Sequence, residues 1–484
     1  MNEEAVLKRL YSLNEWWTNG KVPPTKLEGF RRRDLFYISK KITDSTSILA
    51  IIGPRQVGKT TLVYQAIHDL FRSEVPREQV LFINGDDNIL NTETENTMED
   101  CISIYEKNIL GGPIKNSEKK IYFFIDEIHY IKDWTTRLKN LFDQKYNMKM
   151  VILGSSSSDI LSGSAEALTG RMDIQRVMPL KFIEILRHKM PDHAPLFEES
   201  CRTLRNALKK SIEKGDATEI QKAAKEISRK MIPLNDQIMA LLHHYFINGG
   251  YPEQLKQKDL NEYQQKTRTY IQFTLYKDII RLFNVRDPGK LELLLTFIAE
   301  EGMHGSSYES LCNALQIRKE TLLQYIRYLE YAFLISQSRM YSRNIRKKEI
   351  NPKKIYVCDT GIRNALLDQF NGRILSDESE MGKIAETVVH DHAMRLKHNL
   401  NPAPVITLSY WKEKNEVDIV LEHAKKGIPI EVKYKNRILE SDKKGLNQFL
   451  KKNQGIFGIM VTKNEIYLHE NILEMPLWMF LLMC

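Results

Sequence analysis

Eight residues near the start of the chain combine two glycines, a lysine and a threonine at a spacing that suits phosphate binding. They read GPRQVGKT, occupy positions 53–60, and fit the pattern G-x-x-x-x-G-K-[S/T] in full. The apolar run ILAII precedes them and a predicted helix, TLVYQAI, follows, so backbone N–H groups and a helix N-terminus converge on one place. We expect ATP to bind here, with Lys59 on the β- and γ-phosphates and the Thr60 hydroxyl on Mg²⁺. The expected nucleotide contacts are Gly53, Pro54, Arg55, Gln56, Val57, Gly58, Lys59, Thr60 and Thr61.

A second segment, IYFFIDEIHY at 121–130, places two acids at the end of an apolar run. We expect Asp126 to hold Mg²⁺ through water and Glu127 to polarise the attacking water. The alternative is a pair of surface acids at a strand end, which the phosphate-binding pattern upstream makes less favourable.

Hydroxyl groups follow a third apolar run, MVILGSSS at 150–157. A polar residue at the tip of a strand beside Asp126 can sense the γ-phosphate, and Ser155 and Ser156 are the candidates. An ordinary Gly/Ser loop remains an equal alternative for either residue taken alone.

Near the C-terminus, residues 416–422 and 428–434 alternate polar and apolar side chains around a four-residue loop, which predicts a β-hairpin. Symmetric pairing about that loop places Asp418 opposite Glu431, with Lys433 on the same strand face as Glu431. Two carboxylates suit a hard cation such as Mg²⁺, and the lysine can orient water. The alternatives are an exposed charged hairpin held by salt bridges, or a domain that binds nucleic acid without cutting it.

The elements that must position these residues indicate an α/β protein. Short, fully apolar runs at 48–52, 80–83, 121–125 and 150–153 predict buried parallel strands with helices between them. Residues 188–280 read as helical, with an inserted hairpin at 191–232. Residues 308–340 predict a helix-turn-helix followed by a wing strand, and a further α/β segment follows from residue 353.

In this order, six motifs over almost the whole chain resemble a family of prokaryotic AAA-type ATPases. They are GPRQVGKTT, FFIDEIHYIKDW, ILGSSSSDIL, LTGRMD, NGGYPE and YKDII. The resemblance implies a P-loop core, a helical lid, a winged helix and a C-terminal domain like the PD-(D/E)XK restriction nucleases. It places Arg171 where an arginine can reach the γ-phosphate in cis or across a subunit boundary of a homo-oligomer; an arginine that caps a surface helix is the alternative. It also implies that Glu386, on a predicted helix at 382–397, completes the cation site of Asp418 and Glu431. Asp278 also matches a position of the family. In the family the neighbour of this aspartate is an arginine, whereas in this chain it is Lys277.

These observations divide the chain into an N-terminal helical extension (1–46), a P-loop ATPase core (47–187), a helical insert and lid (188–285), a winged helix (286–345) and a nuclease-like domain (346–484). The formal charge of +9 is a mild basic excess that permits a polyanionic partner. Five widely spaced cysteines without a CxxC pair, and a charged amphipathic start, predict a cytoplasmic protein that does not associate with membranes.

Basic residues in the predicted winged helix suggest that DNA, rather than RNA, is the partner. A purely structural winged helix with a solvated face is the alternative. The leading hypothesis is an ATP-hydrolysing, DNA-acting protein in which nucleotide state controls a Mg²⁺-dependent nuclease-like domain. The alternatives are an ATP-driven switch whose C-terminal domain only binds DNA or a partner, and a DNA-binding regulator without a nuclease step. The residues expected to face DNA in the winged helix are Arg318, Lys319, Gln324 and Arg327. A basic run just after the wing consists of Arg343, Arg346, Lys347 and Lys348, and Lys353 and Lys354 extend it.

Overall fold

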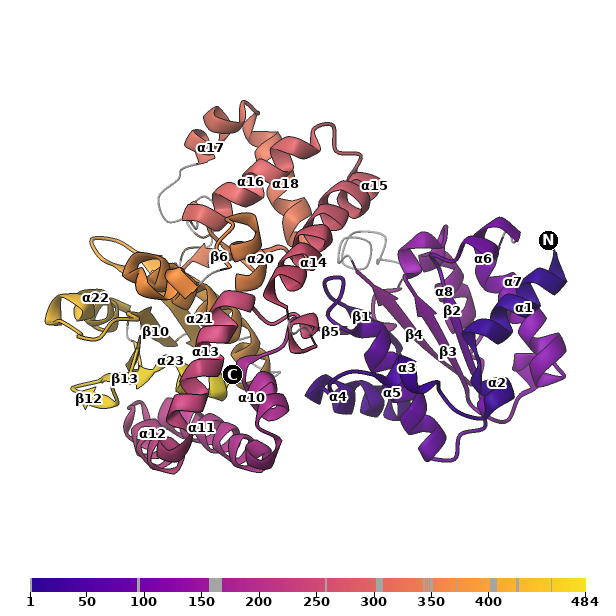
Figure 1. The fold of residues 1–484 in the computed structure, drawn as a ribbon, viewed down its shortest axis with the longest axis horizontal. Coiled ribbons are helices and arrows are strands. Elements are labelled where there is room, and N and C mark those ends of the chain that lie inside the picture. Colours follow the sequence, from indigo (N-terminus) through magenta and orange to yellow (C-terminus); the bar gives the residue numbers. More distant parts are fainter. Residues whose placement is uncertain are drawn as a thin grey trace. The chain divides into compact units, whose positions relative to one another are not determined.

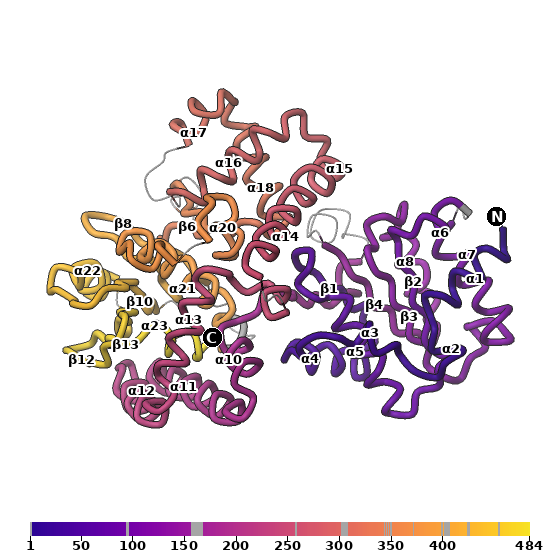
Figure 2. Tube along the Cα trace, in the orientation of Figure 1, coloured from indigo at the N-terminus to yellow at the C-terminus, as the bar shows by residue number. Residues whose placement is uncertain are grey.

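The computed structural model separates into two compact units, which we describe one at a time. The first comprises residues 1–178 with 331–333, and the second comprises 179–330 and 334–484. Figures 1 and 2 follow the chain through each unit, from indigo at the N-terminus to yellow at the C-terminus. The structure describes residues 2–93, 96–155, 168–256, 259–301, 308–342, 344, 346, 348, 351–370, 372–400, 407–423, 426–453 and 455–484.

A parallel sheet forms the centre of the first unit. Its strands follow the order β2-β3-β4-β1-β5, and every neighbouring pair is parallel. The four strands expected from apolar runs are confirmed. Their side chains are apolar on both faces of the sheet, so helices must cover both sides. β5 was not predicted, since its alternating, partly exposed sequence lacks an apolar run. The bounds are β1 (Ile48–Ile52), β2 (Val80–Asn84), β3 (Ile121–Asp126), β4 (Met148–Gly154) and β5 (Met172–Arg176).

Helices supply the layers on the faces of this sheet. One face forms a continuous core with α1, α7 and α8, while on the other face Tyr64 of α5 packs its ring 5.0 Å from that of Phe82. The helices of the unit are α1 (Glu3–Leu13), α2 (Trp16–Asn19), α3 (Pro24–Leu27), α4 (Arg33–Asp44), α5 (Lys59–Arg72), α6 (Asn88–Glu93), α7 (Thr97–Tyr105) and α8 (Trp134–Asp143).

The second unit begins with helices, as the loss of strand patterning predicted. α11 and α12 lie side by side as a hairpin, visible in both Figure 1 and Figure 2. The apolar tail of the chain forms α23, a buried packing helix, and Arg205 of α11 donates from Nε to the carbonyl of Met483 at 2.8 Å. The helices are α10 (Phe182–Lys189), α11 (Ala194–Lys214), α12 (Thr218–Met231), α13 (Asn235–Asn248), α14 (Leu260–Phe273), α15 (Ile280–Phe283) and α23 (Leu477–Met483).

The turn that ends α13 is held by a buried aspartate. Gly249 has a φ of 71°, and the Gly250 N–H donates to Asp359 Oδ2 at 2.7 Å. A Cβ on Gly249 would lie 2.1 Å from Asp359 Oδ1, so only glycine fits. Asp359 also caps α20 (Thr360–Leu366), and it thereby joins two parts of the second unit that are distant in sequence.

The helix-turn-helix segment contains α16 (Pro288–Glu301), α17 (Tyr308–Leu315), α18 (Lys319–Tyr331) and β6 (Ile335–Met340). β6 pairs antiparallel with β7 (Lys354–Val357) and parallel with β8 (Thr407–Lys412), so the strand expected as a wing belongs to the sheet of the second unit. Whether these elements act as a winged helix stays a prediction.

A mixed sheet with the order β12-β13-β11-β10-β9-β8-β6-β7 completes the second unit. The predicted hairpin register is confirmed, since its pairs run from Lys426↔His423 to Ile430↔Ile419 and the next pair in that register is Glu431 with Asp418. The helix expected at 382–397 is also confirmed, within the longer α21 (Glu378–Leu400). The remaining elements are β9 (Glu416–His423), β10 (Lys426–Val432), α22 (Lys444–Asn453), β11 (Gly458–Thr462), β12 (Tyr467–His469) and β13 (Ile472–Pro476).

All five cysteines of the chain have free thiols, in agreement with the lack of a disulfide pattern in the sequence. Over the residues that the structure describes, none of the helices combines the length and the apolar character needed to cross a bilayer.

Candidate functional site

The loop between β1 and α5 has the geometry of a phosphate cradle. Lys59 is 6% exposed, and its Nζ donates to the carbonyls of Gly53 and Pro54 at 2.8 Å each. Gln56 and Gly58 have φ values of 61° and 88°, in the left-handed region that turns backbone N–H groups inward. Gly53 passes so close to the backbone of Val177 that a Cβ would lie 1.9 Å from its carbonyl oxygen. The tight loop thus depends on the residue types that form the sequence pattern.

Thr60 and Asp126 meet at the carboxyl end of the sheet. The Thr60 hydroxyl donates to Asp126 Oδ2 at 2.7 Å, although the two residues are 66 positions apart. Burial, together with the charge of Glu127, raises the pKa of Asp126 to about 6. A hydroxyl and a carboxylate are hard oxygen donors, so the pair fits Mg²⁺ in chemical type, and a divalent ion would offset the buried charge of Asp126.

Glu127 turns away from the direction of β3, with a φ of 46°. Its Oε2 lies 3.4 Å from Nδ1 of His129. The sequence pattern gave no role to His129, although it stands two residues after the acid. This contact orients the Glu127 side chain, and its action on water stays a prediction.

β4 lies between β1 and β3, so its carboxyl end falls between the two halves of the nucleotide site. Ser155 follows β4 and is buried, whereas Ser156 lies outside the described residues. Arg171 forms an ion pair with Asp143 of the same unit, with Nε 3.0 Å from Oδ1. The sensing role of Ser155 and the phosphate-contacting role of Arg171 therefore stay predictions.

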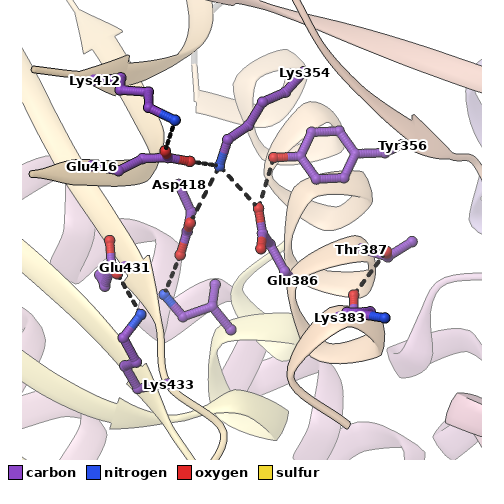
Figure 3. A network of polar contacts seen from close by, with 11 residues as sticks. Lys354, Tyr356, Lys383, Glu386, Thr387, Lys412, Glu416, Asp418, Glu431 and Lys433 are labelled. Atoms are coloured by element: carbon purple, nitrogen blue, oxygen red, sulfur yellow. Dashed lines mark hydrogen bonds and ion pairs between the residues drawn. The ribbon is translucent and has the colours of Figure 1, made fainter. Parts of the chain in front are cut away.

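In the second unit, the structure brings together the four residues expected of the nuclease-like site. Asp418 of β9 accepts a hydrogen bond from the Val432 N–H at 2.9 Å, next to Glu431 of β10. Lys433 Nζ lies 2.5 Å from Glu431 Oε1, and Glu386 approaches from α21 (Figure 3). Asp418 and Glu431 are 8% and 7% exposed, so these two carboxylates are buried and do not form a surface salt-bridge patch.

A lysine expected to lie in an exposed basic run occupies the centre of this cluster. Lys354 Nζ is 3.3 Å from Glu386 Oε1, 2.5 Å from Glu416 Oε1 and 3.4 Å from Asp418 Oδ1 (Figure 3). Its side chain is 4% exposed. The prediction that Lys354 extends the basic run is therefore wrong, because a buried ammonium bound to three carboxylates cannot contact a phosphate backbone.

Glu416, Tyr356 and Lys412 also belong to the cluster and were missed. Glu416 lies two residues before Asp418 on the same strand face, and this spacing is visible in the sequence. The Tyr356 hydroxyl donates to Glu386 Oε1 at 2.9 Å from β7, and nothing in the sequence connects these two residues. The cluster contains the carboxylates of Glu386, Glu416, Asp418 and Glu431, the lysines Lys354, Lys412 and Lys433, and the Tyr356 hydroxyl.

The electrostatics of the cluster reflect its burial. Burial and the neighbouring Asp418 raise the pKa of Glu431 to about 8, and burial with Glu386 raises the pKa of Asp418. Burial alone would lower the pKa of Lys354, but Asp418, Glu386 and Glu416 outweigh it and raise that pKa well above its usual range.

The arrangement does not fit a divalent ion as it stands. Within the described part of the chain, no group of three or more His, Cys, Asp or Glu side chains is placed to hold a metal. The Lys354 ammonium instead contacts the oxygens that a cation would need. Metal binding by Glu386, Asp418 and Glu431 stays a prediction.

Comparison with known families separates the chain into three matched segments. Residues 45–186 match a family described as AAA domain. Residues 239–373 and 381–480 match two families described as domains of unknown function, DUF8612 and DUF4143.

Curated relatives span most of the chain. An uncharacterized protein of Methanocaldococcus jannaschii is 27% identical over 444 residues, which cover 91% of this chain and 85% of that protein. A second uncharacterized protein of the same organism is 25% identical, covering 77% and 72% respectively. A protein of Haemophilus influenzae, also uncharacterized, is 24% identical, covering 66% and 69%.

Two solved structures align at low similarity. The Walker-type ATPase PABY2304 of Pyrococcus abyssi has a TM-score of 0.38 at 14% identity, over 70% of this chain and 96% of that one. The ORC1 protein of Aeropyrum pernix in complex with DNA has a TM-score of 0.30 at 13% identity, over 71% and 94%. TM-scores this low do not establish a shared fold. The match of residues 45–186 and the geometry of the phosphate loop nevertheless agree, and they identify this segment as an AAA-like, P-loop ATPase domain.

Proposed function

We propose that the protein hydrolyses ATP with Mg²⁺ and acts on nucleic acid. The observation that supports hydrolysis best is the 2.7 Å hydrogen bond between Thr60 and Asp126, because it joins the phosphate loop to the acid at the end of β3. Lys59 binds the phosphates, Thr60 and Asp126 hold the ion, and Glu127 accepts the proton of the attacking water. When bound, Mg²⁺ neutralises charge on the phosphate oxygens.

Replacement of Lys59 by alanine tests this proposal. The loop loses its one buried cation, so we expect ATP turnover to fall to background and nucleotide affinity to weaken. Lys115→Ala, at an exposed lysine of the same unit, is the matched control and should keep full turnover. Undiminished turnover by Lys59→Ala would contradict the assignment of this site.

The nucleic-acid part of the proposal is supported by exposed basic residues on and before α18. Arg318, Lys319 and Arg327 are exposed, and Arg346 is exposed further along the chain. Such side chains bind phosphates with release of counterions, so affinity should fall steeply with salt. We expect the slope of log K against log salt to decrease by about 2–3 when Arg318, Lys319 and Arg327 are replaced together by alanine. A titration with no DNA binding at low salt would favour an ATP-driven switch that docks a different partner.

The second unit has two candidate roles. The first is a nuclease-like site in which Glu386, Asp418 and Glu431 hold Mg²⁺ and Lys433 orients water. The second is a unit that binds DNA or a partner without cutting, and the position of Lys354 among the carboxylates favours it. Incubation with linear, nicked and branched DNA and with RNA, with Mg²⁺ or Mn²⁺ and with or without ATP, separates the two.

We also propose that the protein assembles as a homo-oligomer in which Arg171 contacts the nucleotide of a neighbouring subunit. If so, Arg171→Ala should lower turnover without weakening ATP binding, and turnover per subunit should rise with protein concentration. Turnover independent of concentration would favour a role in cis.

A further inference from the structure

The carboxylate cluster of the second unit already contains a cation. Lys354 Nζ contacts Glu416, Glu386 and Asp418, which come from β9 and α21, at 2.5–3.4 Å. These acids arrive from two different elements and converge on one nitrogen, as oxygen ligands converge on a bound ion (Figure 3). A buried acid group without such a partner would carry a large desolvation cost.

The lysine is held in place by its backbone as well as by its charge. Lys354 begins β7 and pairs with Ser338 of β6, so its Cα is fixed at the edge of the mixed sheet. Its Nζ also lies 5.6 Å from the centre of the Tyr410 ring, a favourable cation–π distance. Withdrawal of the ammonium group would forfeit all of these contacts.

We propose that Lys354 is the resident cation of this cluster and that it excludes divalent ions from it. Mg²⁺ binds carboxylate oxygens at about 2.0–2.1 Å and would need the oxygens of Asp418 and Glu386 that Lys354 contacts. A divalent ion and the ammonium cannot share these oxygens, because two positive charges a few Å apart in a buried site repel strongly. This inference concerns only the second unit, so it does not depend on ATP hydrolysis by the first.

Calorimetric titration with Mn²⁺, in the absence of nucleotide, tests the proposal on the full chain. The wild-type protein should show no Mn²⁺ binding that depends on Asp418, so its titration should match that of Asp418→Asn. Lys354→Met vacates the cation position and should gain Mn²⁺ binding that depends on Asp418, with an affinity at least about tenfold above any that the wild-type protein shows. That gain should disappear in the double variant Lys354→Met/Asp418→Asn.

Lys412→Met is the matched control. Lys412 contacts Glu416 Oε2 at 3.1 Å but is 56% exposed, so its removal changes the charge of the cluster without vacating its centre. It should leave Mn²⁺ binding at the wild-type level. An equal gain in Lys412→Met would show that net charge, rather than the place of Lys354, controls the ion.

A thermal readout covers the case in which Lys354→Met folds poorly. The variant Lys354→Met/Glu416→Gln removes one charge of each sign, and Mn²⁺ should raise its unfolding temperature while leaving that of wild type unchanged. Tight Mn²⁺ binding by the wild-type protein that is lost in Asp418→Asn would overturn the proposal, as would the absence of any gain in both Lys354 variants. Undiminished ATP turnover in Lys59→Ala, which would contradict the assignment of the nucleotide site, would leave these results untouched, so the two proposals fail separately.

Discussion

A single methyl group added at Gly53 should disable the nucleotide site. The new Cβ of Gly53→Ala would lie 1.9 Å from the Val177 carbonyl oxygen, and the two atoms must separate by about 1.5 Å to reach ordinary van der Waals contact. Val177 cannot move freely, because its N–H donates to the Ile52 carbonyl at 2.8 Å, next to the loop. Overpacking costs ~1–3 kcal/mol and the loss of that hydrogen bond about 1 kcal/mol. We expect a destabilisation of about 3 kcal/mol, or a displaced loop that no longer binds phosphate.

Chemical denaturation and a fluorescent-nucleotide titration measure the two consequences. Gly112→Ala is the matched control, since nothing lies within 4 Å of its added Cβ and its φ is ordinary. A loss of ~3 kcal/mol in a unit of this size corresponds to a fall of roughly 6–12 °C in melting temperature. If Gly53→Ala keeps both the stability and the nucleotide affinity of Gly112→Ala, the close approach of Gly53 to Val177 does not shape the loop.

Four further outcomes follow from the described contacts. Glu127→Gln should bind ATP but turn it over at least about 10²-fold more slowly, since the shape remains and the base is lost; a wild-type rate in a steady-state assay would move that role elsewhere. Because the pKa of Asp126 is raised to about 6, the free energy of unfolding should fall as pH rises from about 4 to about 6, where the buried acid ionises. Mg-ATP affinity should fall about tenfold between pH 7.5 and pH 5, because the Asp126 carboxylate becomes protonated below its pKa. Asp126→Asn should lack this pH dependence in parallel titrations. Gly249→Ala should destabilise the second unit by about 3 kcal/mol, because its Cβ clashes with Asp359 and its φ is left-handed. Gly382→Ala is the control, since open space surrounds that position, and it should be neutral or slightly stabilising in the same denaturant series.

The sequence went furthest where the residues that act together are adjacent in the chain. The phosphate loop is a contiguous run with an apolar strand before it and a helix after it. Residue types alone therefore predicted this strand, loop and helix, and the structure contains them. The hairpin register was also accessible, because a short loop and a period of two fix which residues face each other. The pairing of Asp418 with Glu431 could therefore be predicted from the sequence alone, and the register of β9 and β10 agrees with it.

The sequence did not predict which partner each charged side chain contacts, because those contacts form through tertiary packing. Lys354 stands in a basic stretch and reads as a surface residue, and only the pairing of β6 with β7 and the approach of α21 turn its ammonium inward to Asp418 and Glu386. Likewise, the requirement for glycine at position 249 comes from Asp359, which is distant in the sequence. Local sequence determines periodicity, turns and short loops because those depend on neighbours in the chain. The partners of buried charges depend on which distant elements close over them, and that was decided by the tertiary structure.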